Sequence, residues 1–258
     1  METLTREGAM QMLNKVPEVT LYFWIIKIMC TTVGETAADF LNADLHFGLT
    51  GTSIVMSILL AIFVIMQLRR NKYVPWLYWV VVVLVSIVGT LITDNLVDNF
   101  GVALETTTIA FSLALLATFA AWYASEKTLS IHSIFTKKRE LFYWAAILFT
   151  FALGTAAGDL AAEGLSLGYA KSALIFGSLI GIVTIAYYGF KVNAVLAFWI
   201  AYILTRPLGA SLGDYLSQSI ENGGLGLGAA VTNTAFLSAI VVLVIYLTVT
   251  RKNAKETI

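Results

Sequence analysis

Carboxylates recur at one fixed place in four long apolar segments of this sequence. Each aspartate lies five residues after a glycine and fifteen after a tryptophan, at Asp39, Asp94, Asp159 and Asp214. A charge inside an apolar segment of a membrane is costly and usually marks an ion or substrate pathway. The residue four positions earlier shares the helix face of the aspartate, and it is Glu35, Thr90, Thr155 and Ala210 in chain order.

Carboxylate and hydroxyl oxygens are hard ligands that suit Na⁺, Mg²⁺, Ca²⁺ or Mn²⁺. We therefore predict a cation or metal site built from Glu35, Asp39, Asp94, Asp159 and Asp214, with Thr90 and Thr155 beside them. Two adjacent like charges also favour a proton on one of them, so the site could equally carry protons. The alternative is structural, because aspartates often cap a following helix or lie in the wet interface.

Two basic residues, Lys27 and Arg206, lie inside apolar segments and do not recur in the other copies. Arg206 precedes Asp214 by eight residues, and Pro207 should loosen the helix there. Lys27 begins a series at helical spacing that continues with Thr31, Glu35 and Asp39. We expect both cations to balance the carboxylates when the site is empty. For Lys27 the alternative is a side chain that extends to the cytoplasmic face.

The composition indicates which elements position these groups. The chain is 59% hydrophobic and 12% charged, whereas a soluble domain carries roughly 25% charged residues. A membrane-spanning helix needs about 20 largely apolar residues. Eight such segments occur, at 20–41, 49–68, 76–97, 104–124, 141–161, 168–190, 194–216 and 225–249. We predict an all-α membrane protein with one integral domain over residues 1–258.

The four copies indicate internal duplication. The tryptophans Trp24, Trp79, Trp144 and Trp199 lie 55, 65 and 55 residues apart. This spacing predicts four two-helix repeats, at about 20–70, 74–124, 139–190 and 194–250, in two four-helix halves joined by a cytoplasmic linker at 125–140. Because each repeat holds two spans, all four share one orientation. Their pseudo-symmetry axis should then run along the membrane normal, as for parallel repeats.

The tryptophans and glycines of the motif have ordinary structural interpretations as well. A tryptophan near a membrane surface is either an interface anchor or a packing residue between repeats. The glycines Gly34, Gly89, Gly154 and Gly209 let a neighbouring helix approach closely, and we favour this over a hinge. The second helix of each repeat begins with polar residues, from which Glu105 and Asn233 are added to the predicted site.

The distribution of charge between the spans predicts the topology. Basic residues gather in the connections after spans two, four and six and near both ends of the sequence, whereas the other connections hold Asp44, Asp98, Glu163 and Glu221. By the positive-inside rule, both termini face the cytoplasm. The net charge is zero, which gives no general attraction to nucleic acid.

The repeat resembles a bacterial membrane family of unknown function, the domain of unknown function 347 type. Its members carry four tandem repeats, each with two transmembrane segments and a tryptophan. The segments that carry the likeness are Tyr22–Leu41, Tyr78–Leu96, Tyr143–Leu160 and Phe198–Leu216. The resemblance implies a location in the bacterial inner membrane and no particular substrate. Ala210 departs from the polar residue found in the other copies, so repeat four should contribute less to a site.

The sequence favours a small secondary transporter or exporter of a cation, including a divalent metal, with proton coupling. An anionic substrate held by Arg206 and Lys27 is a weaker variant. The alternatives are a membrane enzyme that uses paired carboxylates on a lipid-linked substrate and a structural or sensory membrane module. No cofactor is predicted other than a bound metal cation. The expected partners are a small ion or molecule and the lipid bilayer, and the oligomeric state stays open.

Overall fold

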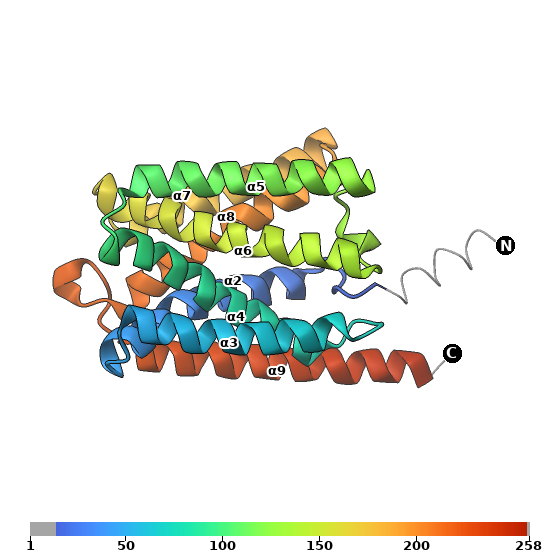
Figure 1. Ribbon diagram of the computed structural model, residues 1–258, viewed down its shortest axis with the longest axis horizontal. Helices are drawn as coiled ribbons and strands as arrows, with labels where there is room; N and C mark the ends of the chain where they lie inside the picture. The colour runs from blue at the N-terminus through green and yellow to red at the C-terminus, as the bar shows by residue number, and fades with distance from the viewer. Residues whose placement is uncertain (1–13, 257–258) are drawn as a thin grey trace.

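The structure is a computed structural model that describes residues 14–256, and these residues form helices and no strands. The description leaves out residues 1–13 and 257–258 and the side chains of residues 251–256. The predicted domain includes all of these residues. Over the described residues the structure has eight long helices, and they run roughly along the long axis of the molecule (Figure 1). They are α2 (Leu21–Asp39), α3 (Gly48–Leu68), α4 (Pro75–Asp94), α5 (Leu104–Glu126), α6 (Lys137–Asp159), α7 (Tyr169–Phe190), α8 (Ala194–Ser217) and α9 (Ala229–Glu256).

The ends of several helices follow local rules of sequence. Thr20 and Thr136 accept hydrogen bonds from backbone amides in the first turns of α2 and α6, as N-caps do. Pro75 occupies the start of α4, where the missing N–H has no partner to lose. The helices α5 and α7 end at Lys127 and Lys191, which adopt the left-handed conformation. The linker between the halves therefore covers 127–136 rather than 125–140.

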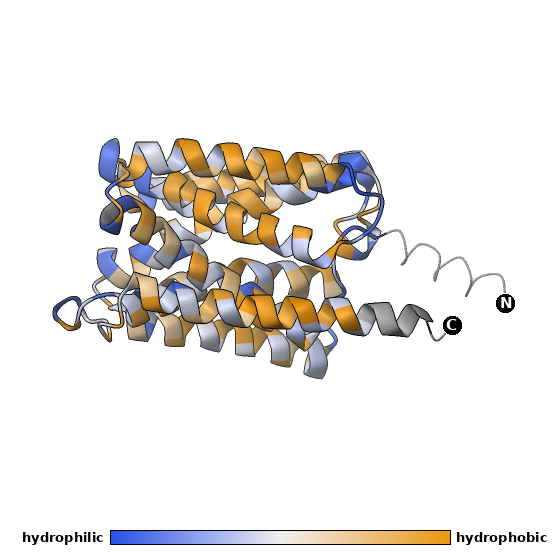
Figure 2. Ribbon diagram, turned by 90° about the horizontal axis from the view of Figure 1, so that it is seen from below, coloured by the Kyte–Doolittle hydropathy of each residue, from blue (hydrophilic) through white to orange (hydrophobic). Residues whose placement is uncertain are grey.

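Hydrophobic residues predominate along the length of the bundle, and hydrophilic residues gather at its two ends (Figure 2). Many large hydrophobic side chains are exposed to the surroundings. Within residues 14–256, seven of the eight helices are long and apolar enough to cross a membrane. The exception is α2, which carries Lys27 and Glu35 and packs against α4, α8 and α9. The prediction of a multi-pass helical membrane protein is confirmed. The helix α2 differs because Lys27, Glu35 and several threonines lower its mean hydropathy.

The first helices of the four repeats form a closed inner ring in which each packs against the next. The same two positions meet at every crossing. A Cβ added at a motif glycine would overlap the residue three positions before the glycine of the next repeat. The pairs are Gly34 with Ser86, Gly89 with Phe151, Gly154 with Arg206, and Gly209 with Thr31. The glycines therefore let the inner helices approach closely, and the last contact closes the ring.

A second closed set of contacts joins the aromatic residues of the motif. Each tryptophan packs against the aromatic residue that precedes the tryptophan of the previous repeat. Ring centroids are separated by 5.7 Å for Trp79 and Phe23, 5.5 Å for Trp144 and Tyr78, 6.3 Å for Trp199 and Tyr143, and 5.7 Å for Trp24 and Phe198. Three of the tryptophans are at most 5% exposed. Packing between repeats therefore describes them better than anchoring at an interface.

The second helix of each repeat packs on the inner helix of the next repeat. Thus α3 lies on α4, α5 on α6, and α7 on α8, while α9 returns to cover α2. Each outer helix consequently buries its inward face against a repeat other than its own. The outer side of the polar helix α2 is thus covered by α9, the last helix of the chain.

The inner helices of repeats one to three change geometry at the motif aspartates. Regular α-helix ends at Asp39, Asp94 and Asp159, short of the predicted ends at 41, 97 and 161. One wider turn of π-helix then follows, at Phe40–Asp44, Asn95–Asn99 and Leu160–Gly164. Such turns are frequent at functional sites. The fourth inner helix continues to Ser217, and a glycine-rich loop delays the start of the last span to Ala229.

The glycine ring leads to a test with a matched control. In Gly89→Ala the added methyl group would meet Phe151 Cβ and the backbone of Ala152. We expect the variant to lose about 1–3 kcal/mol of stability, as overpacked cores do. Gly181, in α7, has open space around its Cα, and Gly181→Ala should gain up to about 1 kcal/mol from helix propensity. Unfolding of both variants in detergent measures the difference, and equal effects would contradict close packing at the ring.

Candidate functional site

Arg206 lies in the middle of the inner ring with its side chain fully buried. Its guanidinium forms an ion pair with Glu35, at 2.8 Å from Nη2 to Oε2. The same nitrogen donates to Thr155 Oγ1 at 2.7 Å and to Thr90 Oγ1. The other terminal nitrogen donates to the carbonyl oxygen of Thr31 at 3.2 Å. A single side chain from repeat four thus holds polar groups from the other three repeats.

The repeat motif explains this convergence. Glu35, Thr90 and Thr155 each follow the ring glycine of their own repeat, so the ring brings them to one level. Repeat four has Ala210 at that position, and it supplies Arg206 from three residues before its glycine. The aliphatic stem of Arg206 passes over Gly154, where a Cβ would overlap its Cβ and Cγ. Repeat four, which has Ala210 in place of a polar residue, is therefore the repeat that supplies the arginine side chain at this level. Although Pro207 follows, α8 continues through it as one helix.

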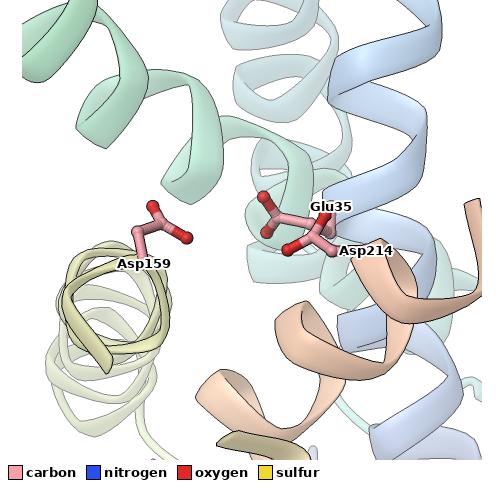
Figure 3. Close-up of side chains that lie close together, drawn as sticks. All are labelled: Glu35, Asp159 and Asp214. Atoms are coloured by element: carbon pink, nitrogen blue, oxygen red, sulfur yellow. The ribbon is translucent and has the colours of Figure 1, made fainter. Parts of the chain in front are cut away.

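Three carboxylates converge next to this arginine. One oxygen each from Glu35, Asp159 and Asp214 lie within 4.8 Å of one another. They come from α2, α6 and α8 and point toward a common space (Figure 3). Glu35 and Asp214 are buried and Asp159 is half-buried. This group, the carboxylate triad, has a donor set and spacing that fit a hard cation. Asp39 and Asp94 are half-buried and lie outside the triad.

The motif aspartates do not act as helix caps where the structure describes the ends. Asp39, Asp94 and Asp159 precede the π-helical turns without a side-chain capping bond. The residues that precede α3, α5 and α7 are Phe47, Ala103 and Gly168. The distance along the chain explains this, because each π-helical turn and loop separates the aspartate from the next helix. The capping alternative therefore does not describe these three residues.

Lys27 lies apart from the carboxylates, contrary to the expectation that it balances them. Its ammonium donates to Thr205 Oγ1 at 3.2 Å. It lies 4.4 Å from the ring centroid of Phe151 and 4.3 Å from that of Tyr202, which are cation–π distances. The side chain is fully buried, so it does not extend to the surface. The series from Lys27 to Asp39 faces α4, α6 and α8, and its described side-chain hydrogen bonds go to those helices or to the backbone of α2.

The polar starts of the outer helices divide into buried and exposed residues. Asn233 is 8% exposed and accepts a 2.8 Å hydrogen bond from Thr36, so it packs against α2. Glu105 is exposed and lies outside the carboxylate triad. The buried polar residues at these starts are Thr52, Thr107, Ser172 and Thr232. Their spacing of 55, 65 and 60 residues is a signal that the sequence interpretation missed.

A second buried polar cluster lies at the other end of the inner helices. Lys15 and Glu140 form an ion pair of 2.6 Å, and both side chains are at most 4% exposed. Gln67 donates to Glu140 at 3.2 Å, and Lys15 also donates to the carbonyl of Leu68 at 3.4 Å. The segment before α2 therefore closes this end of the bundle. Position along the chain does not reveal this cluster, because its residues lie outside the repeat motif and come from three separate segments.

Together these features define a class: a multi-pass helical membrane protein of four internal repeats, with a buried polar site between its inner helices. The family described as Repeat of Unknown Function (DUF347) matches residues 22–73, 77–128, 142–193 and 197–253. The chain belongs to this family, and the resemblance inferred from the four motif copies is confirmed. The comparison with curated proteins and the comparison with solved structures each gave no match.

Proposed function

We propose that this protein is a small secondary transporter, most simply an exporter, of a cation such as a divalent metal. The observation that carries the proposal is that Arg206 pairs with Glu35, a member of the carboxylate triad. The guanidinium of Arg206 is thus already paired with one of the three carboxylates of the site, and the other two are Asp159 and Asp214. A transported cation and the guanidinium would compete for Glu35.

This competition provides a route to transport. A ligand shifts a conformational equilibrium only by binding the two states with different affinity. When a cation binds the triad, Glu35 turns from Arg206 to the cation, and the guanidinium loses its charge partner. The contacts of Arg206 with Thr90, Thr155 and Thr31 join all four repeats, so their release favours a second arrangement of the ring. Protons that replace the cation on the carboxylates would couple transport to a pH gradient.

We place the protein in the bacterial cytoplasmic membrane with both termini in the cytoplasm. The four repeats are proposed to be parallel, with their pseudo-symmetry axis along the membrane normal. The ring of glycine contacts and the ring of aromatic contacts support this, because each repeats one pair of positions from one repeat to the next. In this orientation the triad lies toward the outer side, and the Lys15–Glu140 pair lies at the cytoplasmic side.

The test uses the full-length protein in detergent with a panel of cations that includes Mg²⁺, Ca²⁺, Mn²⁺ and Na⁺. We expect one class of cation to raise the melting temperature, since a ligand at one hundred times its dissociation constant stabilises by about 2.7 kcal/mol. The shift should vanish in Asp159→Asn/Asp214→Asn. The same cation should move across proteoliposomes when a pH gradient is imposed, and the double variant should fail to move it.

Asp44→Asn/Asp98→Asn is the matched control, because it removes two carboxylates that are exposed. It should keep both the thermal shift and the transport of the wild type. Wild-type behaviour of the triad variant would overturn the proposal. So would the absence of a shift with every cation combined with no flux.

A further inference from the structure

A lateral pocket opens between α2, α7 and α8, away from the carboxylate triad. Its volume is about 600 Å³, which is in the range of pockets that bury one small-molecule ligand. It extends along α8 from Ala194 to Thr205, eleven residues or about 16 Å at the rise of an α-helix. Apolar and aromatic side chains such as Trp24, Ile180 and Phe198 form its walls.

Small residues in repeat four create this space. Ala197 and Ala201 line the pocket, and the repeat spacing identifies their equivalents in the other copies. Ala197 corresponds to Tyr22, Leu77 and Phe142, and Ala201 to Ile26, Val81 and Ala146. Repeat four therefore lacks the bulky side chain that each other repeat carries at the first of these positions.

The equivalent groove one repeat further along the ring serves as an internal comparison. It lies between α4 and α9, has a volume of about 280 Å³, and is lined by residues such as Trp79, Val80 and Val244. All residues described as lining it are apolar. The larger pocket differs in having polar residues at its end near the linker, namely Thr20, Ser130 and His132.

Hydrogen-bond donors at the polar end suit an anionic head group. Among the described residues that line the larger pocket none is acidic, and the exposed Glu18 stands just outside the lining, next to Val19. Lys191 stands in the short turn between Tyr188 and Ala194, both of which line the pocket. Lys191 and His132 are exposed and can donate hydrogen bonds. A cation beside an apolar slot of this length matches a carboxylate on one alkyl chain, whereas a phospholipid would need room for two chains.

We propose that this pocket binds one molecule of a single-chain fatty acid. Its carboxylate lies at Lys191 and His132, and its chain follows α8 toward Thr205. This inference concerns a site separate from the carboxylate triad, and it stands or falls independently of cation transport.

The test is native mass spectrometry of the lipid-stripped, full-length protein with palmitate, with palmityl alcohol and with phosphatidylglycerol. We expect the wild type to bind one palmitate saturably. A197L/A201V, which installs the residues that repeat two carries, should weaken palmitate binding at least tenfold. V80L in the smaller groove is the matched control and should bind as the wild type does. Lys191→Gln should weaken palmitate several-fold and leave palmityl alcohol unchanged.

Wild-type palmitate affinity in A197L/A201V would overturn the proposal. Saturable binding of phosphatidylglycerol that A197L/A201V abolishes, without binding of palmitate, would also overturn it in favour of a bilayer lipid. If the double variant does not fold, as judged by its melting curve, the single variant A197L provides the same comparison.

Discussion

Arg206→Met should lower the free energy of unfolding by about 3–5 kcal/mol, the usual result of removing one partner from a buried ion pair. Glu35 would remain buried beside Asp159 and Asp214 without its guanidinium partner. The loss is measured by chemical or thermal unfolding of the purified protein in detergent.

A second substitution makes the same prediction specific. Arg206→Met/Glu35→Gln removes both charges, and we expect it to recover most of the loss, because neutral replacement of a whole buried pair is often tolerated. A double-mutant cycle measures this coupling. Arg206→Lys should not restore stability, since one ammonium cannot reproduce the contacts with Thr31, Thr90 and Thr155. Additive effects of the two single changes would contradict the pairing.

The proposed competition adds a functional readout to this series. In Arg206→Met no internal cation competes for Glu35, so we expect the transported cation to bind the variant more tightly than the wild type. Added cation should also recover part of the lost stability by mass action. Transport should nevertheless fall, because the empty site no longer has a charge that returns the ring to its resting arrangement.

Lys15→Met should have the second largest effect, a loss of about 3 kcal/mol or more, since Glu140 would remain buried and unpaired. Glu140→Gln should cost less, because an amide can keep a hydrogen bond with Gln67. The matched control is Lys138→Met, which removes a pair with Glu126 in which the lysine side chain is 63% exposed. Exposed pairs contribute about 0–1 kcal/mol.

Melting curves of these three variants make the comparison. Similar small losses for Lys15→Met and Lys138→Met would show that the segment before α2 does not seal the bundle. A large loss only at Lys15 would show that this short segment is part of the folded core.

Long apolar runs and the fixed spacing of the motif were sufficient to predict the helical membrane class, the repeats and the family. The apolar runs appear in a hydropathy plot, and the spacing of the motif can be counted along the chain. The sequence also indicated that Arg206 faces the interior, because a charged side chain in a membrane span is costly to expose to lipid. Its partners could not be read in this way. Glu35 precedes Arg206 by 171 residues, and only the closed ring brings the two together.

Lys27 shows where the helical-wheel argument fails. Spacing of four residues places Lys27, Thr31 and Glu35 on one face of α2, and the structure divides that face between different neighbours. Lys27 meets Phe151 and Tyr202, whereas Glu35 meets Arg206. Helical spacing predicts which residues share a face of a helix, but their contacts depend on the side chains of the adjacent helices.

The sequence by itself determined that this is a membrane protein of four helical repeats with a carboxylate in each, because burial in lipid and duplication leave periodic signals along the chain. Tertiary structure decided which carboxylates converge. Glu35, Asp159 and Asp214 each place an oxygen within 4.8 Å of the others, and Asp39 and Asp94 lie outside this group, although the motif treats the four aspartates alike. Two residues break the symmetry of the ring: repeat one alone carries a glutamate, Glu35, after its glycine, and repeat four alone carries an arginine, Arg206, three residues before its glycine. Only the closed ring brings this pair together.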